Sequence, residues 1–344
     1  MPFEIVVVDD SNFMRKALSK LIGSEPGFEV VATYSNGEDA AREVPKVKPS
    51  AVILDVEMGG MDGLATLQRI MATCPTPVIM FSAHTKNGAE VTLKALQAGA
   101  VDFMEKPSGS ISMDLTVVRD ELIKKIRVAM RGRSLMKPLR PLTPNAKLSE
   151  LRVSYPRKSI LAIGSSTGGV QALHEVIPKL PAHFPMPVVI VQHMPPLFTK
   201  SLADSMNSES ALKVKEGEEG DILLPGNVYI APGGFHMTLR TAMNDVVIHL
   251  DTEPSNEPLR PSVDVLFNSV AEYAGRNATG VIMTGMGADG AKGLLEMKEA
   301  GARTIAQDED SCVVYGMPKE AVKIGAASKV IPLDKIPEAI LKAG

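Results

Sequence analysis

The chain has 344 residues, of which 44% are hydrophobic, 22% charged and 4% aromatic, with a formal net charge of −3. This balance is that of a folded protein and excludes a disordered or fibrous chain, and the length favours two domains. The small net charge gives no general reason to expect a nucleic acid or an anionic membrane as partner.

The two cysteines, Cys74 and Cys312, are too few for a disulfide framework and have no metal-ligand spacing. The first residues, MPFEIVVVDD, lack the basic segment of a secretory signal. The longest apolar runs have the length of strands, far short of the roughly 20 residues of a membrane helix. We therefore expect a soluble, cytoplasmic protein that does not insert into membranes.

Residues 1–131 alternate short apolar runs with segments of helical spacing. Strand–helix repeats of this kind predict a parallel sheet covered by helices on both faces, because crossovers between parallel strands are right-handed and carry a helix. We expect a last helix over residues 114–131. The five expected strands cover residues 4–8, 28–34, 51–56, 77–81 and 100–104.

Residues 132–157 contain four prolines and no sustained period, which is typical of a linker of limited flexibility. The region around it is basic: from Arg119 to Lys158, twelve lysines and arginines stand against three acidic residues. A solvated linker and helix face is the preferred interpretation, and a contact surface for an acidic partner is the alternative.

Residues 158–344 resume the alternation and predict a second, doubly wound and mostly parallel α/β domain. Residues 210–250 carry successive strand patterns without helices, which predicts a short antiparallel insert. Helices are expected to begin near residues 169, 197, 262, 290 and 317. Strands are expected at 159–164, 187–192, 228–232, 237–240, 245–250, 278–285 and 302–307.

Polar residues follow the strands of the first domain where these strands end. Asp9 and Asp10 follow the first strand, Asp55 ends the third, Ser82 follows the fourth and Lys106 the fifth. The carboxyl ends of parallel strands share one edge of a sheet, where such folds place their sites. Three carboxylates there call for a hard cation such as Mg²⁺, and the lysine balances a phosphoryl group. Taken singly, each aspartate is more typical of a helix cap or turn.

This arrangement closely resembles the receiver domain of two-component response regulators over residues 1–125. The resemblance implies that a histidine kinase phosphorylates Asp55. It implies Mg²⁺ held by Asp10, Asp55 and the backbone carbonyl of Glu57, with Asp9 nearby through water. It further implies a switch pair, Ser82 and Phe103, and Lys106 followed by Pro107 completes the receiver signature.

One stretch departs from the usual receiver pattern. Gly59 and Gly60 stand where a proline and a basic residue are common in the family. Two glycines add backbone freedom beside the metal site, which bears on the lifetime of the phosphorylated state and not on its position.

The second domain opens with a strand, the turn GSSTGG (164–169) and a helix. Its G-x-S-x-G spacing is that of a nucleophile elbow and selects Ser166 rather than Ser165. The following helix N-terminus offers backbone N–H groups to a developing oxyanion. A helix-capping serine and a phosphate-binding turn remain open, although the turn has neither a P-loop ending nor a dinucleotide-binding order.

A serine nucleophile needs a base and a group that orients the base. Among the six histidines, His193 directly follows a strand and is the best candidate, with His236 second. Asp289, in a glycine-rich turn, is the candidate acid. The non-catalytic alternatives are that the histidine makes a structural hydrogen bond and that the aspartate caps a helix. Against them, the serine, the histidine and the aspartate are all expected at one edge of the sheet. The order serine, histidine, aspartate excludes the α/β-hydrolase fold.

Six motifs across the second domain look like those of the bacterial chemotaxis protein-glutamate methylesterases. They are GSSTGG, QHMPPLFT (192–199), VYIAPGGFHM (228–237), RPSVDVLFNSVA (260–271), TGMGADG (284–290) and AQDEDSCVVYGMP (306–317). The resemblance implies a triad of Ser166, His193 and Asp289 without a metal. It also implies that the Met286 backbone N–H contributes to the oxyanion hole and that Thr167 supports the loop.

The same resemblance implies function and regulation. The substrates would be glutamate γ-methyl esters on methyl-accepting chemoreceptors, and specific receptor glutamines would be deamidated. The unphosphorylated receiver would cover the esterase site, and phosphorylation would release it.

Three other functions are alternatives to this one. The first is a non-catalytic regulator that only binds a partner, and its binding would be unaffected by the loss of Ser166. A DNA-binding output domain lacks a helix-turn-helix pattern or a basic helix in the second domain. An esterase acting on a small metabolite is a variant of the main interpretation.

Overall fold

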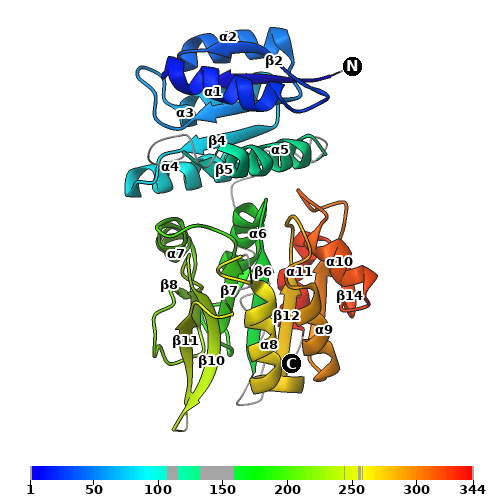
Figure 1. Cartoon of the computed structure of the whole chain (residues 1–344). Coiled ribbons are helices and arrows are strands. Elements are labelled where there is room, and N and C mark those ends of the chain that lie inside the picture. Colours follow the sequence, from blue (N-terminus) through cyan, green and yellow to red (C-terminus); the bar gives the residue numbers. More distant parts are fainter. Residues whose placement is uncertain are drawn as a thin grey trace. The chain divides into compact units, whose positions relative to one another are not determined.

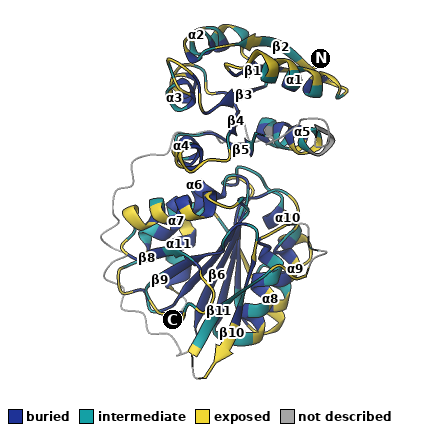
Figure 2. Ribbon diagram, turned by 60° about the vertical axis from the view of Figure 1, so that its left-hand side comes forward, coloured by how far each residue is buried: buried dark blue, intermediate teal, exposed yellow. Residues whose placement is uncertain are grey.

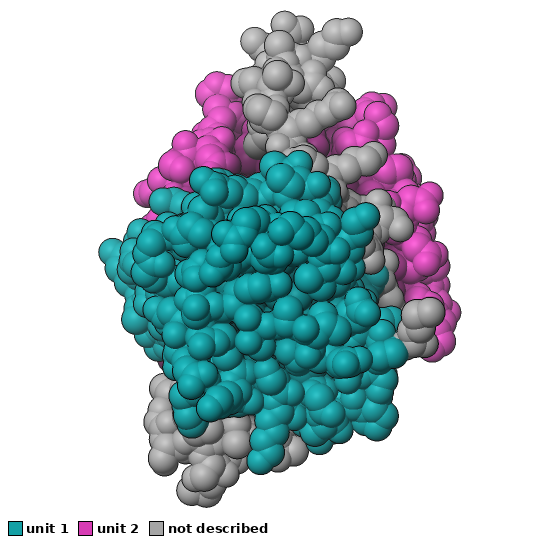
Figure 3. All heavy atoms as spheres, turned by 90° about the horizontal axis from the view of Figure 1, so that it is seen from above, with its two compact units in different colours: residues 1–140 teal, residues 141–344 magenta. Residues whose placement is uncertain are grey.

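In the computed structural model, residues 2–106, 115–131, 159–243, 245–254, 257 and 259–342 are described. The chain divides into two compact units, Met1–Arg140 and Pro141–Gly344, which Figure 3 colours separately. The predicted linker at 132–157 and Pro107 lie outside the described residues. None of the described helices is both long enough and apolar enough to cross a membrane.

The first unit is a five-stranded parallel sheet with the order β2-β1-β3-β4-β5 (Figure 1), as the sequence predicts. Its strand order reverses between β1 and β3, and in open α/β sheets such a reversal forms a crevice at the carboxyl ends of the strands. The strands are β1 Phe3–Val8, β2 Phe28–Tyr34, β3 Ala51–Asp55, β4 Val78–Ser82 and β5 Asp102–Glu105. The helices are α1 Asn12–Gly23, α2 Gly37–Val47, α3 Gly63–Thr73, α4 Lys86–Gln97 and α5 Leu115–Arg131.

The second unit is built on a seven-stranded sheet with the order β14-β13-β12-β6-β7-β9-β8, in which every neighbouring pair is parallel. A separate antiparallel pair is formed by β10 and β11. The strands are β6 Ile160–Ser165, β7 Val188–Gln192, β8 Lys213–Glu216, β9 Asn227–Ile230, β10 His236–Ala242, β11 Asp245–Asp251, β12 Ala278–Ile282, β13 Arg303–Gln307 and β14 Lys329–Ile331.

The helices of this unit begin within a residue of where the sequence pattern predicts them, and one further short helix lies near the C-terminus. The α-helices are α6 Gly169–Val176, α7 Phe198–Glu209, α8 Val263–Ala274, α9 Ala291–Glu299, α10 Met317–Lys323 and α11 Ile336–Leu341. Single 3₁₀ turns cover Ile177–Lys179, Gly275–Asn277 and Leu333–Lys335.

The antiparallel insert is shorter than the expected range of 210–250. Among the described strands only β10 and β11 pair antiparallel, with one isolated antiparallel bridge between Ile222 and Val247, whereas β8 and β9 pair in parallel within the main sheet. The sequence pattern missed β8 and β14 because both are short edge strands, and KVKE, the sequence of β8, has no apolar run. An edge strand needs less apolar surface than a central one.

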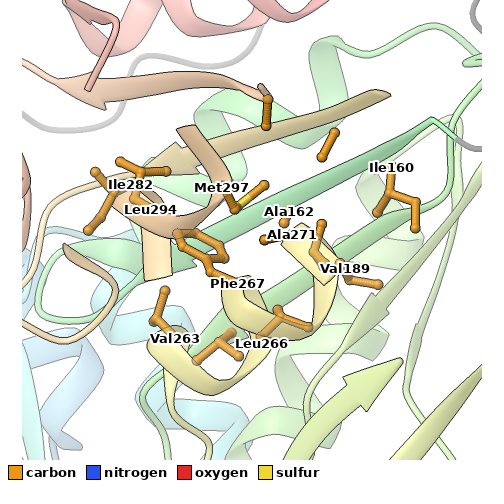
Figure 4. Close-up of a cluster of buried hydrophobic side chains, with 14 of the residues drawn as sticks. Ile160, Ala162, Val189, Val263, Leu266, Phe267, Ala271, Ile282, Leu294 and Met297 are labelled. Carbon is orange, nitrogen blue, oxygen red and sulfur yellow. The ribbon is translucent and has the colours of Figure 1, made fainter. Parts of the chain in front are cut away.

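Burial follows the layered architecture, since the central strands are buried while β10 and β11 become exposed toward one end (Figure 2). Helix α8 packs its apolar stripe on the sheet beside α9, around Phe267, Leu294 and Met297 (Figure 4). At the start of α8, Val263 lies so close to two glycine positions that no Cβ would fit. An added Cβ would lie 2.2 Å from Val263 Cγ1 at Gly164 and 2.5 Å at Gly290.

Truncation of Phe267 tests this packing. Phe267→Ala should lower the free energy of unfolding of the second unit by about 3–5 kcal/mol, because the lost contacts leave a cavity in a close-packed core. Val322→Ala, at an exposed position of α10, should change it by less than about 0.5 kcal/mol. Denaturant titration of the full chain measures both, and equal losses would show that α8 does not anchor the core.

Candidate active site and phosphorylation site

Three carboxylates gather at the strand reversal of the first unit. Asp9 follows β1 and Asp55 ends β3, each with 1% of its surface exposed, and Asp10 lies beside them. One ligand oxygen from each of the three lies within 4.8 Å of the others. Lys106 Nζ lies 2.7 Å from Asp55 Oδ2 and 3.2 Å from Asp9 Oδ2. The structure thus brings together all four charged residues that the sequence placed at this edge.

Burial raises the pKa of Asp55 to about 6. The hydrogen bond and charge of Lys106 lower this pKa, whereas the charge of Asp9 raises it further. Burial by itself would lower the pKa of Lys106, but Asp55 and Asp9 raise it above the usual value. One ammonium group therefore pairs with two of the three carboxylates that gather at this edge. Hard oxygen donors in this number fit Mg²⁺, which takes carboxylate ligands and keeps several waters.

Backbone contacts hold the acidic loops in place. The N–H of Ser11 donates to Asp9 Oδ1 at 2.8 Å, and the N–H of Glu57 donates to Asp55 Oδ1 at 3.1 Å. Arg15 donates to the carbonyls of Asp9 at 2.6 Å and Asp10 at 3.1 Å. Sequence reasoning missed Arg15, whose helical position carries no signal of its contact with the loop.

The Gly59–Gly60 loop is fastened by a residue of α2. Gly60 has a φ of +77°, a region that favours glycine. The next residue, Met61, donates its N–H to Glu38 Oε1 at 2.9 Å. The loop that contains the two glycines is therefore anchored to α2 by the carboxylate of Glu38.

The two expected switch residues are both buried. Ser82 ends β4, and its register partner on β5 is Glu105. Phe103 lies within β5 opposite Met80, with the Lys125 ammonium 5.8 Å from its ring centroid. The side chains thus occupy neighbouring strands of the sheet but different register positions.

The two serines at the end of β6 and in the following turn differ in burial. Ser165 is fully buried and its hydroxyl donates to Gln192 Oε1 at 2.7 Å. Ser166 is partly exposed in the turn, and its carbonyl accepts the N–H of Gly169 at 2.7 Å, which closes the turn before α6. Gly168 adopts a φ of +77°, so the turn needs a glycine there. Of the two serines, only Ser166 is partly exposed, and it is the one that the elbow spacing selects.

His193 and Asp289 form a direct pair. His193 Nε2 lies 2.7 Å from Asp289 Oδ2, and since a carboxylate only accepts, the ring donates from Nε2. Nδ1 is then the ring nitrogen left to face a nucleophile. His193 follows β7 and its N–H donates to the carbonyl of Ser165 at 3.1 Å. The strands β12, β6 and β7 are neighbours, so Asp289, Ser166 and His193 emerge at adjacent strand ends.

Asp289 is fixed by the first turn of α8. Its carboxylate accepts the hydroxyl of Ser262 at 2.8 Å and the N–H groups of Val263 at 2.7 Å and Asp264 at 2.9 Å. Burial by itself would raise the pKa of Asp289, but the hydrogen bonds from His193 and from these N–H groups hold it below its usual value. The aspartate therefore stays ionised and orients the imidazole. Sequence reasoning missed Ser262, which reads as an ordinary helix cap.

The loop after β12 lies against the nucleophile turn. The N–H of Ser166 donates to the carbonyl of Thr284 at 3.0 Å, and Thr284 Oγ1 donates to the carbonyl of Thr167 at 2.9 Å. A Cβ on Gly285 would lie 2.8 Å from Ser166 Cβ. Met286 follows directly, and among the hydrogen bonds of the described residues none uses its backbone N–H as donor.

His236, the second candidate base, is fully buried at the start of β10. Neither ring nitrogen has a hydrogen-bond partner within the described residues. Burial lowers the pKa of His236, and the charge of Arg260 lowers it further. His236 is thus a neutral buried imidazole, whereas His193 has the orienting carboxylate that a base requires.

The lowered pKa of His236 has a consequence for stability. As pH falls below about 6.5 the unfolded chain takes up a proton that the folded chain does not, so the folded state loses stability. Between pH 7.5 and 5.5 the melting temperature of the wild type should therefore fall more steeply than that of His236→Gln. His183→Gln, at an exposed loop position, is the control and should follow the wild type. Parallel curves for all three proteins would contradict the assignment.

The two serines are distinguished by a probe that reacts with activated serines. A fluorophosphonate should label the full chain, with Mg²⁺ and a small phosphodonor present throughout. Ser166→Ala should abolish labelling, whereas Ser165→Ala should retain it within about tenfold, because Ser165 is buried and only supports the turn. Mass spectrometry locates the adduct, and an adduct on Ser165 would contradict the choice of nucleophile.

Two family models match the chain. Residues 161–340 match the family model for the CheB methylesterase, and residues 5–117 match the response regulator receiver domain. The chain is 46% identical to a protein-glutamate methylesterase/protein-glutamine glutaminase of Symbiobacterium thermophilum, covering 99% of this chain and 97% of the relative. A relative of the same name from Pyrococcus horikoshii is 44% identical, with 99% and 93% covered.

A solved structure extends the match to the fold. The catalytic domain of the Thermotoga maritima CheB methylesterase superposes with a TM-score of 0.53 at 46% identity, covering 56% of this chain and all of that domain. The family match thus spans the strand ends that carry Ser166, His193 and Asp289. The chain belongs to the CheB methylesterase family, with a response regulator receiver domain at its N-terminal end.

Proposed function

We propose that this chain is a phosphorylation-activated serine esterase that hydrolyses glutamate γ-methyl esters on chemoreceptors and deamidates receptor glutamines. The observation that carries the proposal is the His193–Asp289 hydrogen bond beside the turn of Ser166. The names of relatives that cover nearly the whole chain support the substrate class.

In the proposed mechanism, Nδ1 of His193 takes the proton of Ser166 as its oxygen attacks the ester carbonyl. Asp289 keeps the proton on Nε2 and stabilises the imidazolium that forms. The imidazolium then protonates the leaving methoxide, and methanol departs from a glutamyl-enzyme. Water, deprotonated by the same imidazole, releases the glutamate carboxylate and restores Ser166. With a glutamine side chain, ammonia leaves in place of methanol.

The tetrahedral intermediate carries an oxyanion that needs donors. We assign one of them to the Met286 backbone N–H, which makes no hydrogen bond within the described residues. Thr167 would support the turn through its carbonyl contact with Thr284. Donors of this kind contribute about 10²–10³ in rate. No metal is required for this site.

In the receiver, Asp55 would accept a phosphoryl group from a histidine kinase. Asp10, Asp55 and the Glu57 carbonyl would hold Mg²⁺, with Asp9 nearby through water. The cation would neutralise charge on the phosphoryl oxygens when bound. Lys106, 2.7 Å from Asp55, would balance the charge of the phosphorylated state, and Ser82 with Phe103 would rearrange in response.

We further propose the division into a receiver at 1–131, a linker at 132–157 and a catalytic domain at 158–344, acting in the cytoplasm. The family matches end at residue 117 and begin at residue 161, on either side of the proposed linker. A covalent linker keeps two domains at a high effective concentration, so a weak interface suffices for control. Phosphorylation at Asp55 would release the esterase site from the receiver.

Methanol release from a methylated receptor cytoplasmic fragment tests the proposal. Release should rise when Mg²⁺ and a small phosphodonor are added, because phosphorylation frees the site. Asp55→Asn should remove this rise and keep the basal rate, whereas Ser166→Ala should lower both rates at least about 10³-fold.

Three outcomes separate the parts of the proposal. Release that ignores the phosphodonor would overturn receiver control while keeping the esterase. Release of methanol from small esters alone would point to a metabolite substrate. A protein that is phosphorylated on Asp55 but releases nothing would favour a non-catalytic regulator.

A further inference from the structure

We propose that Gln192 is a positioning residue that holds the backbone of the nucleophile residue and that of the base residue in one fixed relation. The inference rests on the proposed function in that it takes Ser166 and His193 to act together. Gln192 is the last residue of β7 and is 3% exposed. Its amide lies between the two strand ends from which these residues emerge.

Within the part of the chain that the structure describes, the polar contacts of this side chain are with Ser165, Ser166 and His193. Gln192 Nε2 donates to the carbonyl of Ser166 at 2.9 Å and to that of His193 at 3.3 Å. Gln192 Oε1 accepts the hydroxyl of the buried Ser165 at 2.7 Å. Only this orientation of the amide works, since neither carbonyl can donate. A single rigid amide thus connects residues on either side of the β6–β7 boundary.

The strand register explains why the amide reaches both. Ser165 and Gln192 are partners in the parallel β6–β7 ladder, so their side chains lie on the same face. The ladder continues with the His193 N–H bonded to the Ser165 carbonyl. The Gln192 amide adds a contact with the carbonyl of Ser166, one residue beyond the end of β6.

The start of α6 is shaped around the same amide. A Cβ on Gly169 would lie 2.0 Å from Gln192 Oε1 and 2.8 Å from Ser165 Oγ. The glycine at this position therefore lets the helix begin against the amide. Any side chain there would displace Gln192 without removing a polar group, which provides an independent way to disturb the same contact.

The alternative is that Gln192 only satisfies buried polar groups and so contributes to stability alone. A positioning role predicts a loss in turnover that exceeds the loss in stability, because misplacement by about 1 Å costs up to about 10²-fold in rate. Three variants separate the two roles. Gln192→Met keeps the volume, Gln192→Glu places an acceptor against two carbonyls, and Gly169→Ala displaces the amide.

A matched control comes from a polar network away from the triad. Thr304, buried in β13, donates to the carbonyl of Ala326 at 2.6 Å. Thr304→Val keeps the shape and breaks this hydrogen bond, so it should lower the melting temperature without moving Ser166 or His193. It calibrates how far a loss of stability by itself changes the reaction rate.

The readouts are the fluorophosphonate labelling rate of Ser166, kcat and KM for ester hydrolysis, and the melting temperature, all on the full chain with Mg²⁺ and phosphodonor. The Gln192 and Gly169 variants should lose at least about tenfold in labelling rate and kcat, with KM changed less than about twofold. Thr304→Val should label at the wild-type rate. Gln192→Met that is folded and labels like the wild type would overturn the proposal.

Failure of the proposed function gives a different result. A wild type that labels at Ser166 but releases no methanol would contradict the substrate assignment. The labelling rates of the Gln192 variants would still decide the positioning role.

Discussion

The buried carboxylate of Asp289 is the constraint on which the catalytic end of the second unit depends. A buried charge is costly unless hydrogen bonds replace its lost hydration. Here the donors are the His193 ring, the Ser262 hydroxyl and two N–H groups of α8. Because a helix N-terminus stabilises negative charge, α8 has to begin at this point. Gly164 and Gly290 allow this placement of α8, because a Cβ at either position would collide with the side chain of Val263.

The receiver treats buried carboxylates in the opposite way. Asp55 accepts a single N–H, from Glu57, and depends for the rest on Lys106. Asp55 and Asp9 share that one ammonium, and burial raises the pKa of Asp55 to about 6. This under-compensated charge fits the proposed role of Asp55, which is to receive a phosphoryl group beside a cation. Asp289, whose pKa is lowered, instead suits a residue that holds one orientation throughout a reaction.

The local pattern was informative wherever an element is long and apolar. It predicted the five receiver strands and, within one residue, the start of the helix at Val263, because a buried strand or an amphipathic helix leaves its period in the sequence. The pattern wrongly placed the region of β8 and β9 in the antiparallel insert. A run of short strands does not reveal whether each strand pairs with its neighbour in a parallel or an antiparallel direction. The three-residue β14 carries too little pattern to be recognised.

The sequence alone determined the chemistry: a serine in an elbow turn, a histidine after a strand, and acids and a lysine at the strand ends of a parallel sheet. Those assignments need only residue type and the common edge of parallel strands. Tertiary structure decided which nitrogen of His193 meets Asp289, that Ser262 and α8 hold that carboxylate, and that Gln192 connects Ser166 to His193. These contacts join residues 26 to 96 positions apart. They depend on strand register and helix placement, which no local pattern encodes.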